Sequence, residues 1–233
     1  MAINPSNAHD NLHVCYCGAS GSGKTVAVKC AGLVGKHAAI FDPYGDYRMG
    51  NLKALSGLGN GRKVHHYKTR NNFVKYFIEA LKSGKSFAVA YQPEVSAEKL
   101  RDEALWFAGI MWAAADGNRV LDVVFEELGK YTETAGADRS KLGEIASGGR
   151  KFGLIAHWVF QRPSEVPKTI IANATRHFIG EQQAMVDARR WQDELDCPMA
   201  EIIKLGKLNK KREKHFLYKT KGIGNYQNKV YSF

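Results

Sequence analysis

The 233-residue sequence contains no run of 18 or more apolar residues, and its first residues, MAINPSNAHDN, include no apolar core. The first absence argues against a transmembrane helix, and the second argues against an export signal. Internal repeats, low-complexity segments and an obvious linker are also missing. We therefore expect one domain, residues 1–233, in a protein that is not secreted.

Cysteine is scarce as well, with four residues at Cys15, Cys17, Cys30 and Cys197. Cys15 and Cys17 lie two residues apart in a strand-like run, so both side chains should point to the same face. A metal-binding pair is one interpretation of this spacing. Buried, reduced thiols are the interpretation we favour, because they are typical of intracellular proteins.

Acidic residues are in the minority: the sequence has 34 Lys and Arg but only 23 Asp and Glu, which gives a formal net charge of +11. The excess gathers at 61–70 and in the basic C-terminal segment 204–233, mainly at 204–215. This charge suits a polyanionic partner such as nucleic acid. A general contribution to solubility is the alternative explanation.

The stretch GASGSGKT follows the apolar run LHVCYC and fits the pattern G-x-x-x-x-G-K-[ST]. Its glycines let successive backbone N–H groups point into one anion-binding concavity, and the helix that follows adds its positive end. Lysine supplies a charge for the β- and γ-phosphates, and threonine supplies a hydroxyl for Mg²⁺. The sequence thus predicts an ATP-binding loop made of Gly18, Ala19, Ser20, Gly21, Ser22, Gly23, Lys24 and Thr25.

Strand-like and helix-like segments alternate along the chain, which predicts an α/β fold. We expect a mostly parallel β-sheet flanked by helices, with a RecA-like P-loop NTPase core. The glycines around Gly222-Ile-Gly224-Asn predict a C-terminal β-hairpin. The predicted strands cover 12–17, 37–43, 63–68, 86–92, 120–127, 153–161 and 176–182. The predicted helices cover 23–34, 71–84, 97–115, 138–150, 184–195 and 198–205.

Two strand ends carry residues suited to hydrolysis. The run VVFEE places Glu126 where it can serve Mg²⁺ and Glu127 where it can polarise the attacking water. Most such strands end in Asp-Glu, so Glu126 is a departure, and two exposed carboxylates are the plain alternative. Gln161 closes another apolar strand, where an amide can contact both the γ-phosphate and the water.

Several motifs in order resemble the FtsK–HerA superfamily of ring-shaped DNA-pumping ATPases. FDPYGDY (41–47) resembles the D-x-x-G-E-Y turn of HerA-like proteins, and residues 149–180 resemble their sensor region. With the phosphate loop and VVFEE, the resemblance spans residues 12–182. It implies that Gln161 is the sensor and that Arg150 reaches the nucleotide of a neighbouring subunit. Arg139 and Arg162 are the rival arginines.

The short chain resembles the genome-packaging ATPases of icosahedral viruses with an internal membrane. That resemblance implies ATP-driven translocation of double-stranded DNA by a homo-oligomeric ring, expected as a hexamer. It also implies capsid-vertex or portal partners and a location in the host cytoplasm or at the packaging vertex. Loops 59–66 and 131–141 are the candidate DNA contacts. A P-loop kinase and an ATP-dependent phage assembly or secretion protein are the alternative functions.

Overall fold

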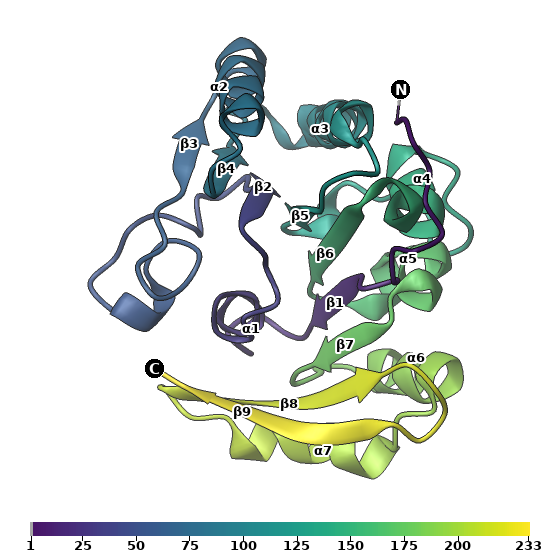
Figure 1. The fold of residues 1–233 in the computed structure, drawn as a ribbon. Helices are drawn as coiled ribbons and strands as arrows, with labels where there is room; N and C mark the ends of the chain where they lie inside the picture. The colour runs from purple at the N-terminus through teal and green to yellow at the C-terminus, as the bar shows by residue number, and fades with distance from the viewer. Residues whose placement is uncertain (1) are drawn as a thin grey trace.

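The computed structural model describes residues 2–233, and this part of the chain contains nine strands and seven α-helices (Figure 1). The strands are β1 (Val14–Cys17), β2 (His37–Phe41), β3 (His65–Tyr67), β4 (Phe87–Tyr91), β5 (Leu121–Phe125), β6 (Leu154–Phe160), β7 (Arg176–Ile179), β8 (Glu213–Thr220) and β9 (Tyr226–Ser232). The helices are α1 (Lys24–Cys30), α2 (Arg70–Ser83), α3 (Leu100–Ala114), α4 (Lys141–Gly148), α5 (Lys168–Asn173), α6 (Met185–Leu195) and α7 (Met199–Leu208).

All nine strands belong to one sheet, in the order β3-β4-β2-β5-β6-β1-β7-β8-β9. The first seven in this order pair in parallel, whereas β8 runs antiparallel to β7 and β9 antiparallel to β8. The predicted α/β class and the C-terminal hairpin are both confirmed. The hairpin also extends the main sheet, which the sequence pattern did not indicate.

Helices cover both faces of the sheet, and the central strands β1, β2 and β5 are buried at every position. The larger core packs α2 to α7 on one face, and it includes Phe107 of α3. The smaller core packs α1 and residues from the β2–β3 connection on the other face. Figure 1 shows α1 apart from the other helices, beside β1. This arrangement leaves the carboxyl ends of the central strands free for a site.

Local signals explain where some helices begin and end. Thr69 accepts a hydrogen bond from the Asn72 backbone N–H and begins α2, and Gly84 ends it at φ 65°. Helix α1 is shorter than predicted, ending at Cys30, and the predicted helix 138–150 is α4 followed by a 3₁₀ turn at Gly149–Phe152. Within residues 2–233, no helix is both long and apolar enough to cross a membrane.

Candidate active site

The sheet order brings three loops together, because β5, β6 and β1 are neighbours and run parallel. The segments that follow their carboxyl ends are the glutamate pair at 126–127, the strand end at Gln161 and the phosphate loop at 18–25. Loops at this edge of a parallel sheet form the usual ligand site of such folds. Motifs that lie more than 100 residues apart in the sequence thereby meet in space.

Three glycines give the phosphate loop its shape. Gly18, Gly21 and Gly23 all have positive φ, at 155°, 78° and 96°. Gly18 and Gly23 are also crowded: an added Cβ would lie 2.5 Å from Ser22 Oγ and 2.5 Å from Lys214 Cγ, respectively. Side chains at these two positions would strain the backbone and collide with neighbours. The loop therefore has the curled conformation that the motif predicts.

Lys24 folds back over this loop. Its ammonium donates to the carbonyl oxygens of Gly18 at 2.8 Å and Ala19 at 3.1 Å. Burial lowers the pKa of Lys24, while the carboxylate of Glu127 opposes this shift. The charged amine thus occupies the concavity where phosphate oxygens would replace the carbonyl partners.

Glu127 and Gln161 meet directly at this edge. The Gln161 side-chain amide donates to both carboxylate oxygens of Glu127, at 3.3 and 3.1 Å. Glu127 has φ 55° and ψ 41°, a left-handed conformation that is costly for a glutamate and is common at functional sites. A carboxylate held in this way by an amide is well placed to orient a water molecule.

Two adjoining pockets share Gln161 and Arg162. One, of about 310 Å³, is also lined by Ala19 and Ser20 of the phosphate loop. The other, of about 330 Å³, is also lined by Glu127. Together they provide a solvent-accessible space between the phosphate loop and the Glu127–Gln161 pair.

Glu126 lies beneath this surface and is almost fully buried. Its carboxylate accepts a hydrogen bond of 2.6 Å from the Tyr47 hydroxyl. Burial raises the pKa of Glu126 to about 8, against the lowering effect of that hydrogen bond, and the nearby Asp46 and Asp42 carboxylates raise it further. The Tyr47 hydroxyl thus holds the Glu126 carboxyl in a buried position that disfavours its charged form.

The turn FDPYGDY holds Tyr47 in place. Asp42 accepts backbone hydrogen bonds from Gly45, Asp46 and Tyr47, and its second oxygen lies 3.1 Å from His66 Nε2. The family resemblance of this turn does not by itself indicate a role for Tyr47 or Asp46. Their positions beside Glu126 and Lys24 show that the motif is part of the site.

The oxygen groups here fit a Mg²⁺ ion, which prefers hard oxygen ligands. Among residues 2–233 the Thr25 hydroxyl has no hydrogen-bond partner, so it is free to act as a ligand. Glu126 and Asp46 supply carboxylates whose charge acts on Lys24. A divalent cation would favour the ionised form of Glu126 and offset its burial.

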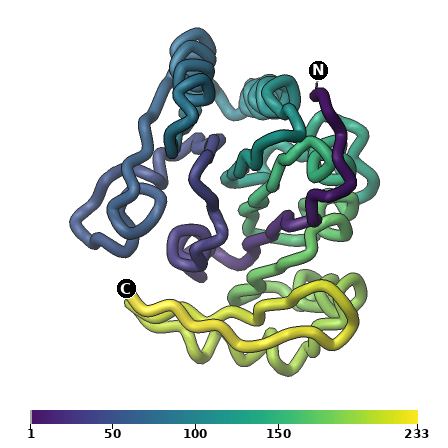
Figure 2. The backbone as a smooth tube through the Cα atoms, viewed as in Figure 1, coloured from purple at the N-terminus to yellow at the C-terminus, as the bar shows by residue number. Residues whose placement is uncertain are grey.

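The three candidate trans arginines lie in different places. Arg150 precedes β6, so it lies at the edge of the sheet opposite Gln161, roughly 20 Å away by the length of the strand. Its guanidinium donates to the His9 carbonyl at 2.9 Å, in the N-terminal segment that Figure 2 shows along this edge. Arg150 is therefore outside its own subunit's site, as a trans role requires, and that role stays a prediction.

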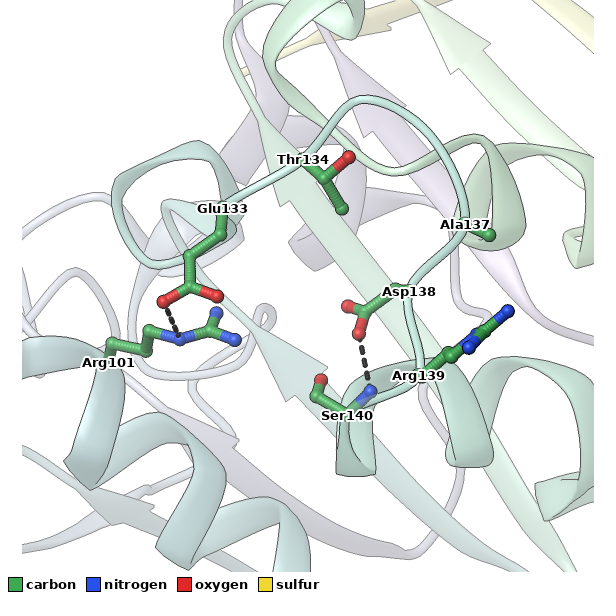
Figure 3. A pocket seen from close by; sticks show the side chains of 7 residues that line it. All are labelled: Arg101, Glu133, Thr134, Ala137, Asp138, Arg139 and Ser140. Carbon is green, nitrogen blue, oxygen red and sulfur yellow. Dashed lines mark hydrogen bonds and ion pairs between the residues drawn. The ribbon is translucent and has the colours of Figure 1, made fainter.

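Arg162 and Arg139 differ in their partners. Arg162 pairs with Asp187 at 3.1 Å and Glu165 at 3.2 Å, beside its own subunit's Gln161. Arg139 borders a pocket of about 270 Å³ in the 131–141 loop, where its side chain points away from Asp138 and Arg101 (Figure 3). Within the described chain, no hydrogen bond or ion pair holds its exposed guanidinium.

The two candidate DNA loops differ in how many of their basic side chains are exposed and not held by contacts within the protein. In 59–66, the Arg62 guanidinium donates to four backbone carbonyls, Val64 is buried and His66 contacts Asp42. Lys63 is the exposed cation of this loop. In 131–141, Arg139 and Lys141 are the cations. Neither loop is assigned by the structure, but most of 59–66 serves the fold.

The central strands also bury a histidine and two thiols. His157 is buried in β6, with Nε2 2.8 Å from Asp122 Oδ1 and Nδ1 3.1 Å from the Tyr16 hydroxyl. Cys15 and Cys17 are both buried on one face of β1, and burial raises the pKa of the Cys15 thiol. No cluster of three metal-ligating His, Cys, Asp or Glu side chains occurs in residues 2–233.

The sheet and the loop define the fold of a P-loop NTPase. The chain shares it with the genome packaging NTPase B204 from Sulfolobus turreted icosahedral virus 2 in complex with ATP-gammaS, at a TM-score of 0.57 and 17% identity. That match covers 95% of this chain and 97% of B204. A second structure, that of B204, the DNA-packaging ATPase from Sulfolobus Turreted Icosahedral Virus, matches at a TM-score of 0.52 and 15% identity. This match covers 100% of the present chain and 98% of that B204 chain.

A further similarity comes from sequence. Protein P9 of Pseudoalteromonas phage PM2 is 24% identical over 208 residues, which cover 89% of this chain and 85% of P9. No model of a known protein family matches the chain. The resemblance to viral genome-packaging ATPases is thus confirmed at the level of the fold, over nearly the whole length.

Proposed function

We propose that this chain is an ATP-driven double-stranded DNA translocase that packages a viral genome into a preformed capsid. The observation that carries the proposal is the contact between Glu127 and Gln161 beside the phosphate loop, on a fold shared with B204 from end to end. A phosphate loop alone would suit many enzymes. The carboxylate–amide pair adds the means to orient water, which hydrolysis requires.

In this proposal the residues have distinct tasks. The loop from Gly18 to Thr25 binds the phosphates of ATP, and Lys24 leaves its carbonyl partners to contact the β- and γ-phosphates. Thr25 and Glu126 would hold Mg²⁺, which neutralises charge on the β- and γ-phosphates when bound. Glu127 orients the attacking water, and Gln161 senses the γ-phosphate.

We propose a single ATPase domain that works as a homo-oligomeric ring, a hexamer by the family pattern. The net charge of +11 supports a DNA partner, since lysines and arginines bind phosphates without reading the bases. A capsid-vertex or portal partner and a location in the host cytoplasm or at the packaging vertex belong to the same proposal. The match to viral packaging ATPases over nearly the whole of both chains supports them.

The test is the steady-state ATPase rate with and without duplex DNA of mixed sequence. The proposal predicts stimulation by DNA and loss of turnover in Lys24→Ala, which removes the phosphate-binding charge. A control variant, Lys75→Ala, changes an exposed lysine of α2, away from the loop. Turnover that is unaffected by duplex DNA, or that persists in Lys24→Ala, would count against the proposal and favour a kinase or an assembly protein.

A further inference from the structure

The C-terminal hairpin contacts the phosphate loop. Lys214, the second residue of β8, lies with its aliphatic stem against Gly23: a Cβ on Gly23 would come within 2.5 Å of Lys214 Cγ, 2.9 Å of its Cβ and 3.1 Å of its Cδ. Gly23 directly precedes Lys24 in the loop. A second lysine from the far end of the sequence is therefore packed on the N-cap residue of α1.

The Lys214 ammonium is unpaired within the part of the chain that the structure describes. Among residues 2–233 it makes no hydrogen bond or ion pair, whereas its neighbour Lys210 pairs with Glu213 at 3.1 Å. Lys214 is also only half-exposed, unlike Lys211. An unpaired cation whose stem is fixed against a phosphate loop is suited to contact the phosphates of a nucleotide.

Hydrogen bonds hold this part of the chain beside the loop. The Ala19 backbone N–H donates to the Glu181 carbonyl at 2.8 Å, and Asn209 Nδ2 donates to the Glu181 carboxylate at 3.2 Å. Asn209 Oδ1 in turn accepts from the His215 backbone N–H at 2.9 Å. This connected set joins the phosphate loop to the start of β8, so the position of Lys214 is built into the fold.

We infer that Lys214 is a second nucleotide-binding lysine, which contacts the phosphate chain of a nucleoside triphosphate bound in the same subunit. The inference rests on the proposed function, because it uses the same nucleotide site. It reassigns one cation of the basic segment 204–215 from nucleic acid to ATP. It also means that the C-terminal hairpin lines one side of the nucleotide site.

The test measures ATP affinity without DNA, by displacement of a fluorescent ATP analogue. Lys214→Met keeps the stem against Gly23 and removes the charge. We expect its ATP dissociation constant to rise roughly 10- to 100-fold, the range for losing a hydrogen bond to a charged group. Lys211→Met is the matched control, since it removes the same charge from an exposed neighbour, and its affinity should equal that of the wild type.

Two further measurements separate binding from structure. The melting temperature of nucleotide-free Lys214→Met should equal that of Lys211→Met, because the stem contact is retained. Lys214→Arg should regain most of the affinity. Equal ATP affinity in Lys214→Met and Lys211→Met, with tight binding by the wild type, would overturn the inference and leave the proposed function intact. Wild-type protein that binds no ATP would overturn both.

Discussion

At the residue scale, the most informative contact is that between Glu127 and Gln161. Glu127 is held in a strained backbone conformation with its carboxylate on the Gln161 amide. The left-handed backbone costs conformational free energy at Glu127, the residue whose carboxylate this contact positions. It follows that the negative charge of Glu127, rather than its size, should determine the rate of hydrolysis.

Glu127→Gln should therefore bind ATP with nearly wild-type affinity and hydrolyse it about 10²- to 10⁴-fold more slowly, the usual contribution of a positioned acid or base. Single-turnover hydrolysis of radiolabelled ATP provides the measurement. Glu133→Gln, at an exposed carboxylate paired with Arg101, is the control. A rate near that of the wild type would move the role to another acid, with Glu126 and Asp46 the first to test.

Tyr47 stabilises the neighbouring acid. Its hydroxyl is the hydrogen-bond donor to the buried Glu126 carboxylate. Tyr47→Phe would leave that buried acceptor without its partner, and we expect the free energy of unfolding to fall by about 1–3 kcal/mol. Denaturant unfolding measures this loss, with Tyr226→Phe on the exposed hairpin as control. Equal stability of the two variants would show that the Tyr47 hydroxyl is dispensable.

At the element scale, the adjacent strands β1 and β7 carry two buried histidines: His13 directly precedes β1, and His177 lies within β7. Burial lowers the pKa of His13 and of His177 to about 4, from an ordinary value of 6.5. Both are neutral in the folded protein at pH 5–6, whereas the unfolded chain binds protons there. Their contribution to stability is thus complete above pH 6.5 and is lost as the pH falls toward 4.

The folded protein should therefore lose stability on acidification through this window. Glu126 opposes the trend, because its raised pKa means that the folded state holds a proton between about pH 4.5 and 8. Below pH 6, the protons that the two histidines bind in the unfolded state outnumber the one proton that Glu126 holds in the folded state, so stability still falls with pH. His177→Gln should flatten the slope by up to about 1.4 kcal/mol per pH unit, measured by unfolding at pH 5 and 6. An unchanged slope would contradict the assignment of His177 as buried and neutral.

How far the sequence predicts these elements depends on the range of the interactions. The phosphate loop, the alternation of strands and helices, and the acids at the end of β5 follow from local patterns, and the structure contains them. The pairing of β8 with β7 joins residues 38 to 44 positions apart, such as Ile179 and Leu217. The contact of Lys214 with Gly23 joins residues almost 200 positions apart. The Tyr47–Glu126 bond joins residues 79 apart. Local periodicity holds no information about such contacts.

At the scale of the whole molecule, the question is whether an arginine of a neighbouring subunit completes the candidate nucleotide site. Arg150 lies at the edge of the sheet opposite its own nucleotide site, whereas Arg139 is exposed and unpaired within the described residues. Either position is compatible with contact to another subunit. The Arg162 guanidinium is paired with Asp187 and Glu165 in its own subunit.

Mixing of variants tests the trans role. Arg150→Ala should bind ATP normally but hydrolyse it about 10³-fold more slowly, as for other arginine fingers. Adding Lys24→Ala subunits, which retain Arg150, should restore part of the activity at mixed interfaces. The ATPase rate of mixed assemblies is the readout, and thermal melting controls for loss of the His9 contact. No recovery in demonstrated mixed rings would exclude Arg150, and Arg139 and Arg162 would then be tested in the same way.

The most direct test of the central claim is displacement of a triplex-forming oligonucleotide from duplex DNA. A translocase moving along the duplex removes the third strand, and a kinase or an assembly protein does not. We expect the wild type to displace the third strand in an ATP-dependent reaction on duplexes of unrelated sequence, and Glu127→Gln to displace none. ATP hydrolysis by a protein that binds the duplex yet never displaces the third strand would contradict translocation.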